Sequence, residues 1–280
     1  MTNSSFFLIP TDIFKKDFLK NGGDFFELET KNSPVAGVTL TSNTTMKSSD
    51  GTVPLTTSLS AKWAHPSGFT LDKINFKGVG HKIEVENSLE NVIPDLKLEF
   101  KGDDHEKGEL LATYKVAPAT VKATFDIMKQ AKGELSVATV QAPFTVGGIL
   151  SFETKEKVTT TDVSASAAYS AGPIFAGIIS SKMFKSFELL SSYAVSKEIS
   201  VAAKVEANDK GKGFGFKTIA GATYKCNPNT FIKGKIDSDA TLDLSVTQKV
   251  DKNLSVSVWA QTKFPAAATP SFGIKAVLGN

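Results

Sequence analysis

The sequence lacks arginine, because all 32 of its basic residues are lysines. Arginine is the side chain that binds phosphate and guanine in a bidentate manner, and the formal net charge is only +3, so a nucleic-acid-binding protein is excluded. A single cysteine, Cys226, excludes an internal disulfide framework and is expected of a protein made in a reducing compartment. No stretch approaches the roughly 20 apolar residues that a transmembrane helix needs, which excludes a helical membrane protein.

The first residues, MTNSSFFLIPTDIFKK, contain no positively charged region followed by an apolar core and a cleavage site. They therefore do not read as a secretory signal, which a bacterial outer-membrane protein would normally carry. Asp12 and Asp17, with no arginine, also fit an ordinary mitochondrial presequence poorly.

One segment, residues 9–20 (IPTDIFKKDFLK), is predicted to be a helix. Its apolar residues recur at helical spacing and its charged residues occupy the other face, which makes the helix amphipathic. Gly22 and Gly23 follow it and predict a flexible stop. The helix is too short to span a bilayer, so we expect it to lie against a surface that is apolar on one side and wet on the other.

From Phe25 onward the hydrophobic period changes to two, as in FFELETK, LKLEFK and TLDLSVTQ. Such alternation is typical of strands with one apolar and one polar face, and short turns between the runs predict hairpins. The runs predict nineteen strands, with no composition change that would mark a second domain, at residues 25–31, 36–44, 54–63, 68–77, 80–87, 95–101, 108–116, 119–128, 133–140, 145–154, 161–170, 173–181, 186–194, 198–207, 213–225, 229–237, 240–248, 254–263 and 271–279.

Two architectures can use such strands. A soluble β-protein turns the apolar face toward a core, whereas a membrane β-barrel turns it toward lipid and lines a watery lumen with the polar face. The repeat of about 13 residues suits membrane strands of about 9–11 residues with tight turns, and the small residues of the apolar face would pack a soluble core poorly. The pattern favours the membrane barrel and leaves the soluble protein open.

The sequence also resembles a known family at both of its ends. The core of the C-terminal resemblance is Lys233-Gly234-Lys235-Ile236-Asp237-Ser238, then Leu242 and Thr247-Gln248-Lys249, while Lys16-Asp17-Phe18-Leu19 with Phe25 and LETK at 28–31 carries the N-terminal part. These segments resemble the voltage-dependent anion channel, the mitochondrial porin. Ser271, Gly273, Ala276 and Leu278 in the closing SFGIKAVL fit the family's barrel-insertion signal. Nineteen strands is the number known for this family, so the strand count is not independent of the resemblance.

The resemblance implies an all-β fold: a single 19-stranded transmembrane β-barrel closed by a parallel pair of first and last strands, with the short N-terminal amphipathic helix inside the pore. Residues 1–23 would form the pore helix and hinge, and residues 24–280 the barrel. The expected residues of the pore helix are Ile9, Asp12, Ile13, Phe14, Lys15, Lys16, Phe18 and Lys20, with Gly22 and Gly23 as the hinge.

The resemblance also implies the function: a passive, voltage-gated channel of the mitochondrial outer membrane for ATP, ADP, phosphate and other small anions. It would use no catalytic site, cofactor or metal. Its expected partners are membrane lipid, permeating nucleotides and anions, and further copies or other mitochondrial membrane proteins, with no nucleic acid. The alternatives are the related import barrel, which usually carries a longer N-terminal extension, and a soluble β-protein that binds a lipid or another ligand.

Alternation of faces predicts which lysines point into the lumen: Lys31, Lys62, Lys82, Lys97, Lys101, Lys115, Lys122, Lys233 and Lys235. About as many carboxylates share that face, so the count alone does not predict anion selectivity. Some members of the family carry a membrane-facing glutamate on the fourth strand. Here Phe69 and Leu71 set the outward parity, which predicts that Lys73 faces outward and Asp72 inward.

Overall fold

The computed structural model describes residues 12–15, 18, 25–47, 55–77, 82–90, 93–104, 108–128, 132–154, 158–209, 211, 213–264 and 270–279. It contains one short helix, α1 (Asp12–Lys15), and nineteen strands. The strands are β1 (Phe25–Val35), β2 (Val38–Lys47), β3 (Leu55–Ala64), β4 (Phe69–Lys77), β5 (Lys82–Glu90), β6 (Leu96–Asp103), β7 (Gly108–Val116), β8 (Ala119–Asp126), β9 (Lys132–Gln141), β10 (Phe144–Thr154), β11 (Val158–Ala171), β12 (Ile174–Ser181), β13 (Ser186–Ala194), β14 (Ile199–Asp209), β15 (Phe214–Asn227), β16 (Thr230–Asp237), β17 (Thr241–Lys249), β18 (Leu254–Lys263) and β19 (Ser271–Leu278).

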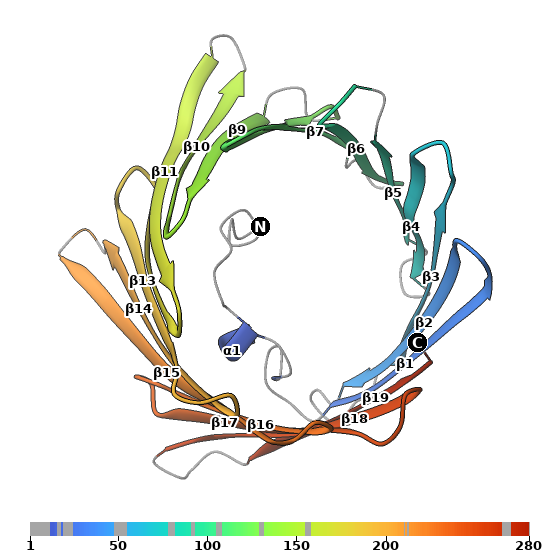
Figure 1. Ribbon diagram of the computed structural model, residues 1–280, viewed down its shortest axis with the longest axis vertical. Coiled ribbons are helices and arrows are strands. Elements are labelled where there is room, and N and C mark those ends of the chain that lie inside the picture. The colour runs from blue at the N-terminus through green and yellow to red at the C-terminus, as the bar shows by residue number, and fades with distance from the viewer. Residues whose placement is uncertain are drawn as a thin grey trace.

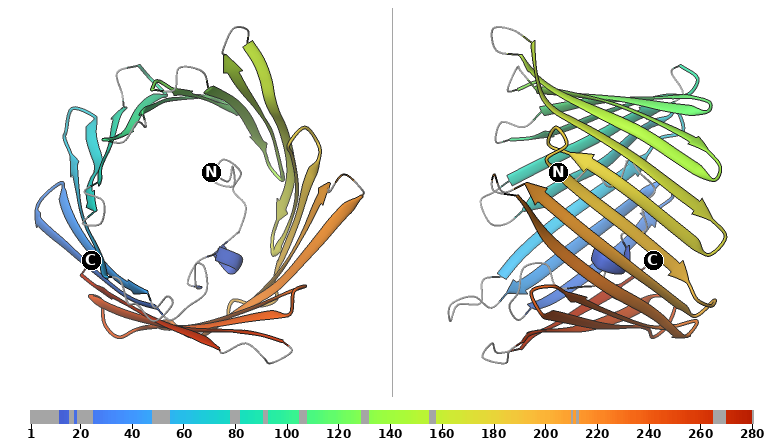
Figure 2. Two further views of the ribbon diagram at one scale, coloured as in Figure 1. Left: turned by 180° about the vertical axis from the view of Figure 1, so that it is seen from behind. Right: turned by 90° about the vertical axis from the view of Figure 1, so that its left-hand side faces the viewer.

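The strands form one closed barrel around an open lumen (Figure 1). Each strand pairs in antiparallel fashion with the next along the chain, and β1 pairs in parallel with β19, with Phe25 opposite Gly273 and Thr30 opposite Leu278. The strands are tilted with respect to the barrel axis, as barrel closure requires (Figure 2). The prediction of a nineteen-stranded barrel is confirmed, and closure gives each described strand a partner on both sides.

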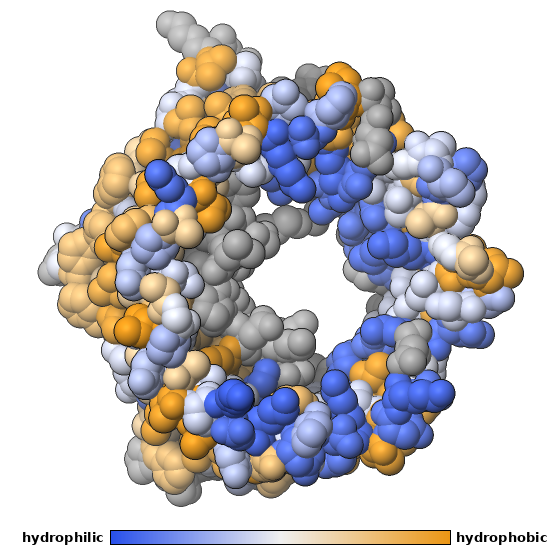
Figure 3. Space-filling view, in the orientation of Figure 1, coloured by the Kyte–Doolittle hydropathy of each residue, from blue (hydrophilic) through white to orange (hydrophobic). Residues whose placement is uncertain are grey.

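Side chains alternate between the two surfaces of this barrel. Large apolar side chains of the described strands are exposed on the outer surface, for example Leu55, Leu59 and Trp63 on β3 and Ile232 and Ile236 on β16. Polar side chains between them face the lumen, and Figure 3 shows hydrophilic residues gathered along the opening over β1–β8 and β16–β19. A continuous outer surface of exposed apolar side chains is costly in water and favourable in lipid, so the faces suit a barrel that spans a membrane.

The two ends of the barrel differ in their turns. One end carries the turns at 36–37, 65–68, 93–95, 117–118, 142–143, 172–173, 195–198, 228–229 and 250–253, together with the end of β19, and we call it the C-terminal mouth. The turn at 36–37 needs glycine, because Gly37 has φ +80° and a Cβ there would lie 2.9 Å from the carbonyl oxygen of Ala64. The opposite mouth carries the start of β1 and the remaining turns.

The predicted helix over residues 9–20 is described only in part. Residues 12–15 are helical, and residues 9–11, 16, 17, 19 and 20 lie outside the described residues, as do Gly22 and Gly23. In the part of the chain that the structure describes, no helix is long and apolar enough to cross a membrane.

Candidate functional site: the lumen and its docked helix

The predicted lumen lysines lie on the inner wall wherever their side chains are described. Lys31, Lys62, Lys97, Lys101, Lys115, Lys122, Lys233 and Lys235 each alternate with outward residues of their strand. On β16, for example, Lys233 and Lys235 alternate with the exposed Ile232 and Ile236. Lys82 belongs to β5, but its side chain lies outside the described residues.

On the wall formed by β1 to β6, these lysines contact carboxylates. Lys31 lies 2.9 Å from Glu29, Lys62 lies 3.9 Å from Asp72, and Lys97 lies 3.1 Å from Glu90. Lys101 lies 4.0 Å from Glu86. Because a lysine and a carboxylate in contact present almost no net charge to an ion several ångströms away, this wall is polar but nearly neutral.

A departure from alternation on β4 corrects the prediction for the fourth strand. Lys73 does not face outward: its Nζ lies 3.3 Å from Glu84 Oε2 and 3.6 Å from Glu86 Oε1, inside the lumen. The register of β4 shifts between Leu71 and Lys73 against both neighbouring strands, which is a β-bulge. The extra residue turns Asp72 and Lys73 to the same side, so neither faces lipid, and Ile74 resumes the outward position.

Across the parallel seam, a further group of charges joins the first strand to the last. Lys275 Nζ on β19 lies 2.8 Å from Glu27 Oε1 and 2.8 Å from Glu29 Oε2 on β1. Asn43 on β2 donates to the same Glu27 oxygen over 2.7 Å. Lys275 is directly opposite Glu27 in the register, so these ion pairs form only when the barrel closes in this alignment.

The helix α1 packs on the inner wall over β15 and β16. Phe14 of the helix is 5% exposed and Phe18, just beyond it, is 6% exposed. The wall approaches the helix closely because β15 carries Gly221 there: a Cβ on Gly221 would lie 3.1 Å from Ile13 Cγ2 and 3.4 Å from Phe14 Cε1. Glycine within a strand often marks such a close approach.

Lys235 on β16 fastens this contact. Its ammonium donates a 3.1 Å hydrogen bond to the carbonyl oxygen of Phe14 and lies 4.4 Å from the ring centroid of Phe18. The Phe14 carbonyl is at the C-terminal end of α1, where a cation interacts favourably with the unpaired carbonyl groups. A lysine expected only to line the lumen therefore contacts the helix through two different groups.

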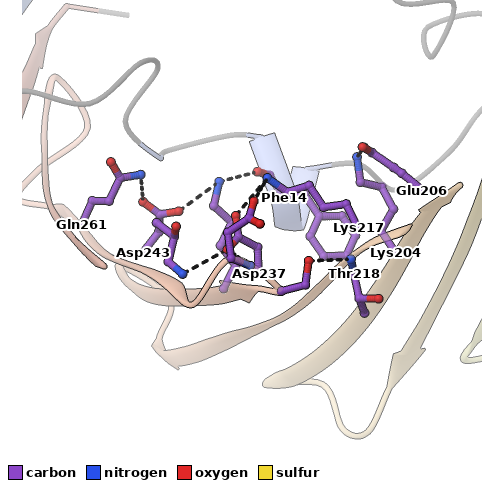
Figure 4. A network of polar contacts seen from close by, with 12 residues as sticks. Phe14, Lys204, Glu206, Lys217, Thr218, Asp237, Asp243 and Gln261 are labelled. Carbon is purple, nitrogen blue, oxygen red and sulfur yellow. Dashed lines mark hydrogen bonds and ion pairs between the residues drawn. The ribbon is translucent and has the colours of Figure 1, made fainter. Parts of the chain in front are cut away.

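A buried carboxylate, that of Asp243, holds Lys235 in place, and Figure 4 shows Asp243 beside Gln261 below the helix. Asp243 on β17 is directly opposite Lys235 in the strand register, and its Oδ2 lies 3.4 Å from Lys235 Nζ. Asp243 is 5% exposed, and its other oxygen accepts a 2.7 Å hydrogen bond from Gln261 Nε2 on β18. Three neighbouring strands thus hold one ammonium group in position, and we call Phe14, Phe18, Lys235, Asp243 and Gln261 the helix clamp.

Two other lysines on the same side of the lumen form ion pairs (Figure 4). Lys217 on β15 lies 3.1 Å from both Asp237 and Asp239 near the opposite mouth. Lys204 and Glu206, both on β14, form an ion pair. Like the pairs on β1 to β6, these leave little uncompensated charge in the lumen.

The structure assembles only part of the predicted pore helix and insertion signal. Ile13, Phe14 and Phe18 come together with the predicted lumen lysine Lys235, whereas Asp12 and Lys15 are described only as backbone of α1, and Ile9, Lys16, Lys20, Gly22 and Gly23 lie outside the described residues. Of the insertion-signal residues, Ser271 and Gly273 face inward and Ala276 and Leu278 outward on β19.

Gly221 and Gln261 were not predicted as site residues. Gly221 lies in a run of small residues that resembles any other lipid-facing strand, and its inward position becomes informative only with the helix in place. Gln261 is recognisable only from the register that puts β18 beside Asp243. Within the described segments, no group of three or more histidine, cysteine or acidic side chains has the geometry of a metal site.

Comparison with known proteins identifies the family of this barrel. The sequence profile of the family described as eukaryotic porin matches residues 11–273. No curated protein sequence matches the chain significantly.

Among solved structures, a triple mutant of the Rhodopseudomonas blastica porin is similar over 86% of this chain and 92% of that chain, with 11% sequence identity and a TM-score of 0.50. A double mutant of the same porin covers the same shares at 11% identity and a TM-score of 0.49. At this identity the likeness concerns the fold alone. With the profile match over nearly the whole chain and the closed barrel with its polar lumen, the chain belongs to the eukaryotic porin family and forms a membrane β-barrel that serves as a passive channel for small solutes.

Proposed function

We propose that this barrel is a voltage-gated channel of the mitochondrial outer membrane that passes ATP, ADP, phosphate and other small anions. The observation that carries the proposal is the helix clamp, which holds α1 against the inner wall instead of leaving the lumen clear. An element that occupies part of the lumen and is held by a few polar contacts can bind in more than one position. Its position would then change the conductance.

The chemistry of the clamp supports voltage sensitivity. The contact between Lys235 and Phe14 joins a charged group of the wall to a helix whose sequence carries Lys15, Lys16 and Lys20. Charges that move along the membrane normal respond to the potential at about 2.3 kcal/mol per elementary charge per 100 mV. A contact of a few kcal/mol is therefore of the right size to be broken by moderate voltages.

In this proposal, residues 1–23 form the pore helix and hinge and residues 24–280 form the barrel. The apolar outer surface contacts membrane lipid, the lumen contacts permeating nucleotides and anions, and further copies or other mitochondrial membrane proteins are neighbours in the membrane. No catalytic reaction is required for any of these roles. The related protein-import barrel stays the alternative.

Reconstitution into planar bilayers tests the proposal. We expect large stepwise conductance that falls at high voltage of either sign, a reversal potential in a salt gradient that favours anions, and release of ATP from loaded vesicles. Absence of conductance steps in repeated preparations would overturn it. Co-purification with a stable translocase, together with a pore that ignores ATP, would favour the import barrel.

A further inference from the structure

The lysines of the lumen differ in whether a carboxylate accompanies them. Lys225 on β15 and Lys249 on β17 both face the lumen, and the Nζ of each lies 5.9 Å from the ring centroid of Phe231 on β16. Among the described side chains, neither forms an ion pair or a hydrogen bond through its ammonium. At 5.9 Å the ring holds these cations only weakly and does not neutralise them. We call Lys225, Phe231 and Lys249 the mouth cluster.

This cluster differs from most lysines elsewhere on the inner wall. The described lysines of β1, β3, β4 and β6 contact carboxylates at 4.0 Å or less, and so do those at 204, 217, 235 and 275. Lysines without an ionic partner among the described residues also lie on β8, β9 and β18, at 122, 132 and 263. A count of charges treats all lysines alike and gives a lumen that is nearly neutral. The ion pairs divide the lysines into two groups, those beside a carboxylate and those without one. Only an ammonium group without a compensating carboxylate produces a field that reaches an ion on the axis of the lumen.

The cluster lies at one end of the barrel. Lys225 is close to the end of β15 and Lys249 is the last residue of β17, and both strands end at the C-terminal mouth. On the far side of the same mouth, Lys115 near the end of β7 also has no ionic partner among the described residues. The described residues of that mouth without an ionic partner comprise three acidic residues, Asp95, Glu198 and Asp251, and five lysines, Lys115, Lys197, Lys225, Lys249 and Lys252.

Inward carboxylates without an ionic partner in the described segments are found toward the other end. Glu109 is the second residue of β7, Glu134 the third of β9 and Glu188 the third of β13, and all three strands start at the opposite mouth. The described lysines of that end without an ionic partner, at 132, 182, 185 and 263, are matched in number by these three carboxylates and Asp162. The excess of uncompensated positive charge in the described lumen therefore lies toward the C-terminal mouth.

We propose that Lys225 and Lys249 determine the anion preference of this channel and that they do so from the C-terminal mouth, which makes the preference different for the two directions of flow. The ligand chemistry is a phosphate group, whether free or carried by a nucleotide, or a smaller inorganic anion. This inference rests on the proposed passage of anions and adds which residues select them. The aromatic ring between the two ammonium groups keeps them on one surface without supplying a compensating charge.

The double variant K225Q/K249Q tests the proposal in planar bilayers under a salt gradient. The dilute side is kept at about 0.01 M, where the screening length is about 30 Å and charges at the mouth reach the axis. Two unit charges at about 10 Å in water change the local concentration of a monovalent anion about fourfold. We therefore expect the anion-to-cation permeability ratio to fall about fourfold or more, and current rectification at low salt to decrease.

A matched control carries two substitutions at the same mouth with no net change in charge. K197Q/E198Q alters the turn between β13 and β14, and its permeability ratio should stay within about 1.5-fold of the original. Equal ratios in K225Q/K249Q and in the unmodified protein, with conductance steps of unchanged size, would overturn the inference and leave the proposed channel intact. A protein that conducts nothing, or that prefers cations before any substitution, would instead refute the proposed anion channel.

A second variant tests sidedness without relying on the first. In C226S/K249C, a methanethiosulfonate reagent carrying a positive charge should restore the anion preference, and a negatively charged reagent should lower it further. Both should react faster from the side on which the C-terminal mouth opens. Equal effects of the two reagents, or equal rates from the two sides, would contradict a selecting charge at that mouth.

Discussion

The helix clamp predicts that Lys235→Met releases α1 from the wall while leaving the barrel intact. Methionine keeps the apolar stem of lysine but loses the hydrogen bond to the Phe14 carbonyl and the contact with the Phe18 ring. A hydrogen bond to a charged group contributes about 1.5–3 kcal/mol, and a cation over an aromatic ring about 0.5–2 kcal/mol. The lysine side chain is 20% exposed, so solvent weakens these contacts only in part.

The two contributions sum to about 2–5 kcal/mol, since the contacts involve different atoms of the helix segment. The equilibrium constant for docking should then fall by about 30-fold to about 5,000-fold. Asp243 would lose its cation but would still accept the hydrogen bond from Gln261, so the strands around it should keep their register.

The assay measures how often the helix leaves the wall. In a Cys226→Ser background, Ile13→Cys puts a thiol at the helix contact beside Gly221. Its rate of reaction with a maleimide in detergent micelles reports the undocked fraction when docking is fast compared with labelling. Lys235→Met should raise this rate by at least about tenfold, and single-channel recordings should show more open-state noise.

Lys225→Met serves as the control, because the only described contact of that ammonium is the ring of Phe231. Its labelling rate should stay unchanged. If Lys235→Met also leaves the rate unchanged, the apolar contacts of Phe14 and Phe18 alone dock the helix, and the reasoning from the clamp is wrong.

Three further substitutions test other contacts of the inner wall. Gly221→Leu should raise the labelling rate of the Ile13→Cys thiol as Lys235→Met does, because the new side chain would occupy the space of the helix. An unchanged labelling rate would contradict this. Lys275→Glu should lower the free energy of unfolding, measured by circular dichroism in micelles, by at least about 2 kcal/mol, because charge repulsion replaces two ion pairs. Adding Glu27→Lys to this variant should recover part of the loss. Gly273→Val should cost about 1–3 kcal/mol in the same measurement, because its side chain would overlap the indole of Trp259; an unchanged midpoint would show that the indole moves freely.

The fold could be predicted from the sequence because a barrel repeats one simple rule. Alternation of apolar and polar residues specifies the two faces of each strand independently, as FFELETK does for β1 and LKLEFK for β6. Short turns then make every neighbour antiparallel, and an odd number of strands requires a parallel pair at closure. Ends of strands were less predictable: β11 begins at Val158 instead of residue 161, since its first residues pair with the end of β10 but show no alternation of apolar and polar residues.

The site was less predictable because its chemistry depends on register, which alternation does not determine. Alternation along each strand predicts that Lys235 and Asp243 face inward, but only the pairing of β16 with β17 shows that they are opposite each other. Sequence distance gives no hint either, since Lys235 contacts Phe14 across 221 residues.

The fourth strand shows how a single inserted residue interrupts the alternation from which side-chain direction is predicted. Leu71 and Ile74 both face outward, although strict alternation puts them on opposite faces, and the bulge between them accommodates Asp72 and Lys73 on the inner wall. Lys73 there contacts Glu84 and Glu86, so the bulge also removes one cation from the uncompensated set. Selectivity in such a lumen therefore follows from which charges the register pairs and which it leaves unpaired, and a bulge that shifts one residue changes both the face and the pairing. For this reason the number of lysines in the sequence predicts the anion preference poorly, while the positions of Lys225 and Lys249 in the register predict a sided one.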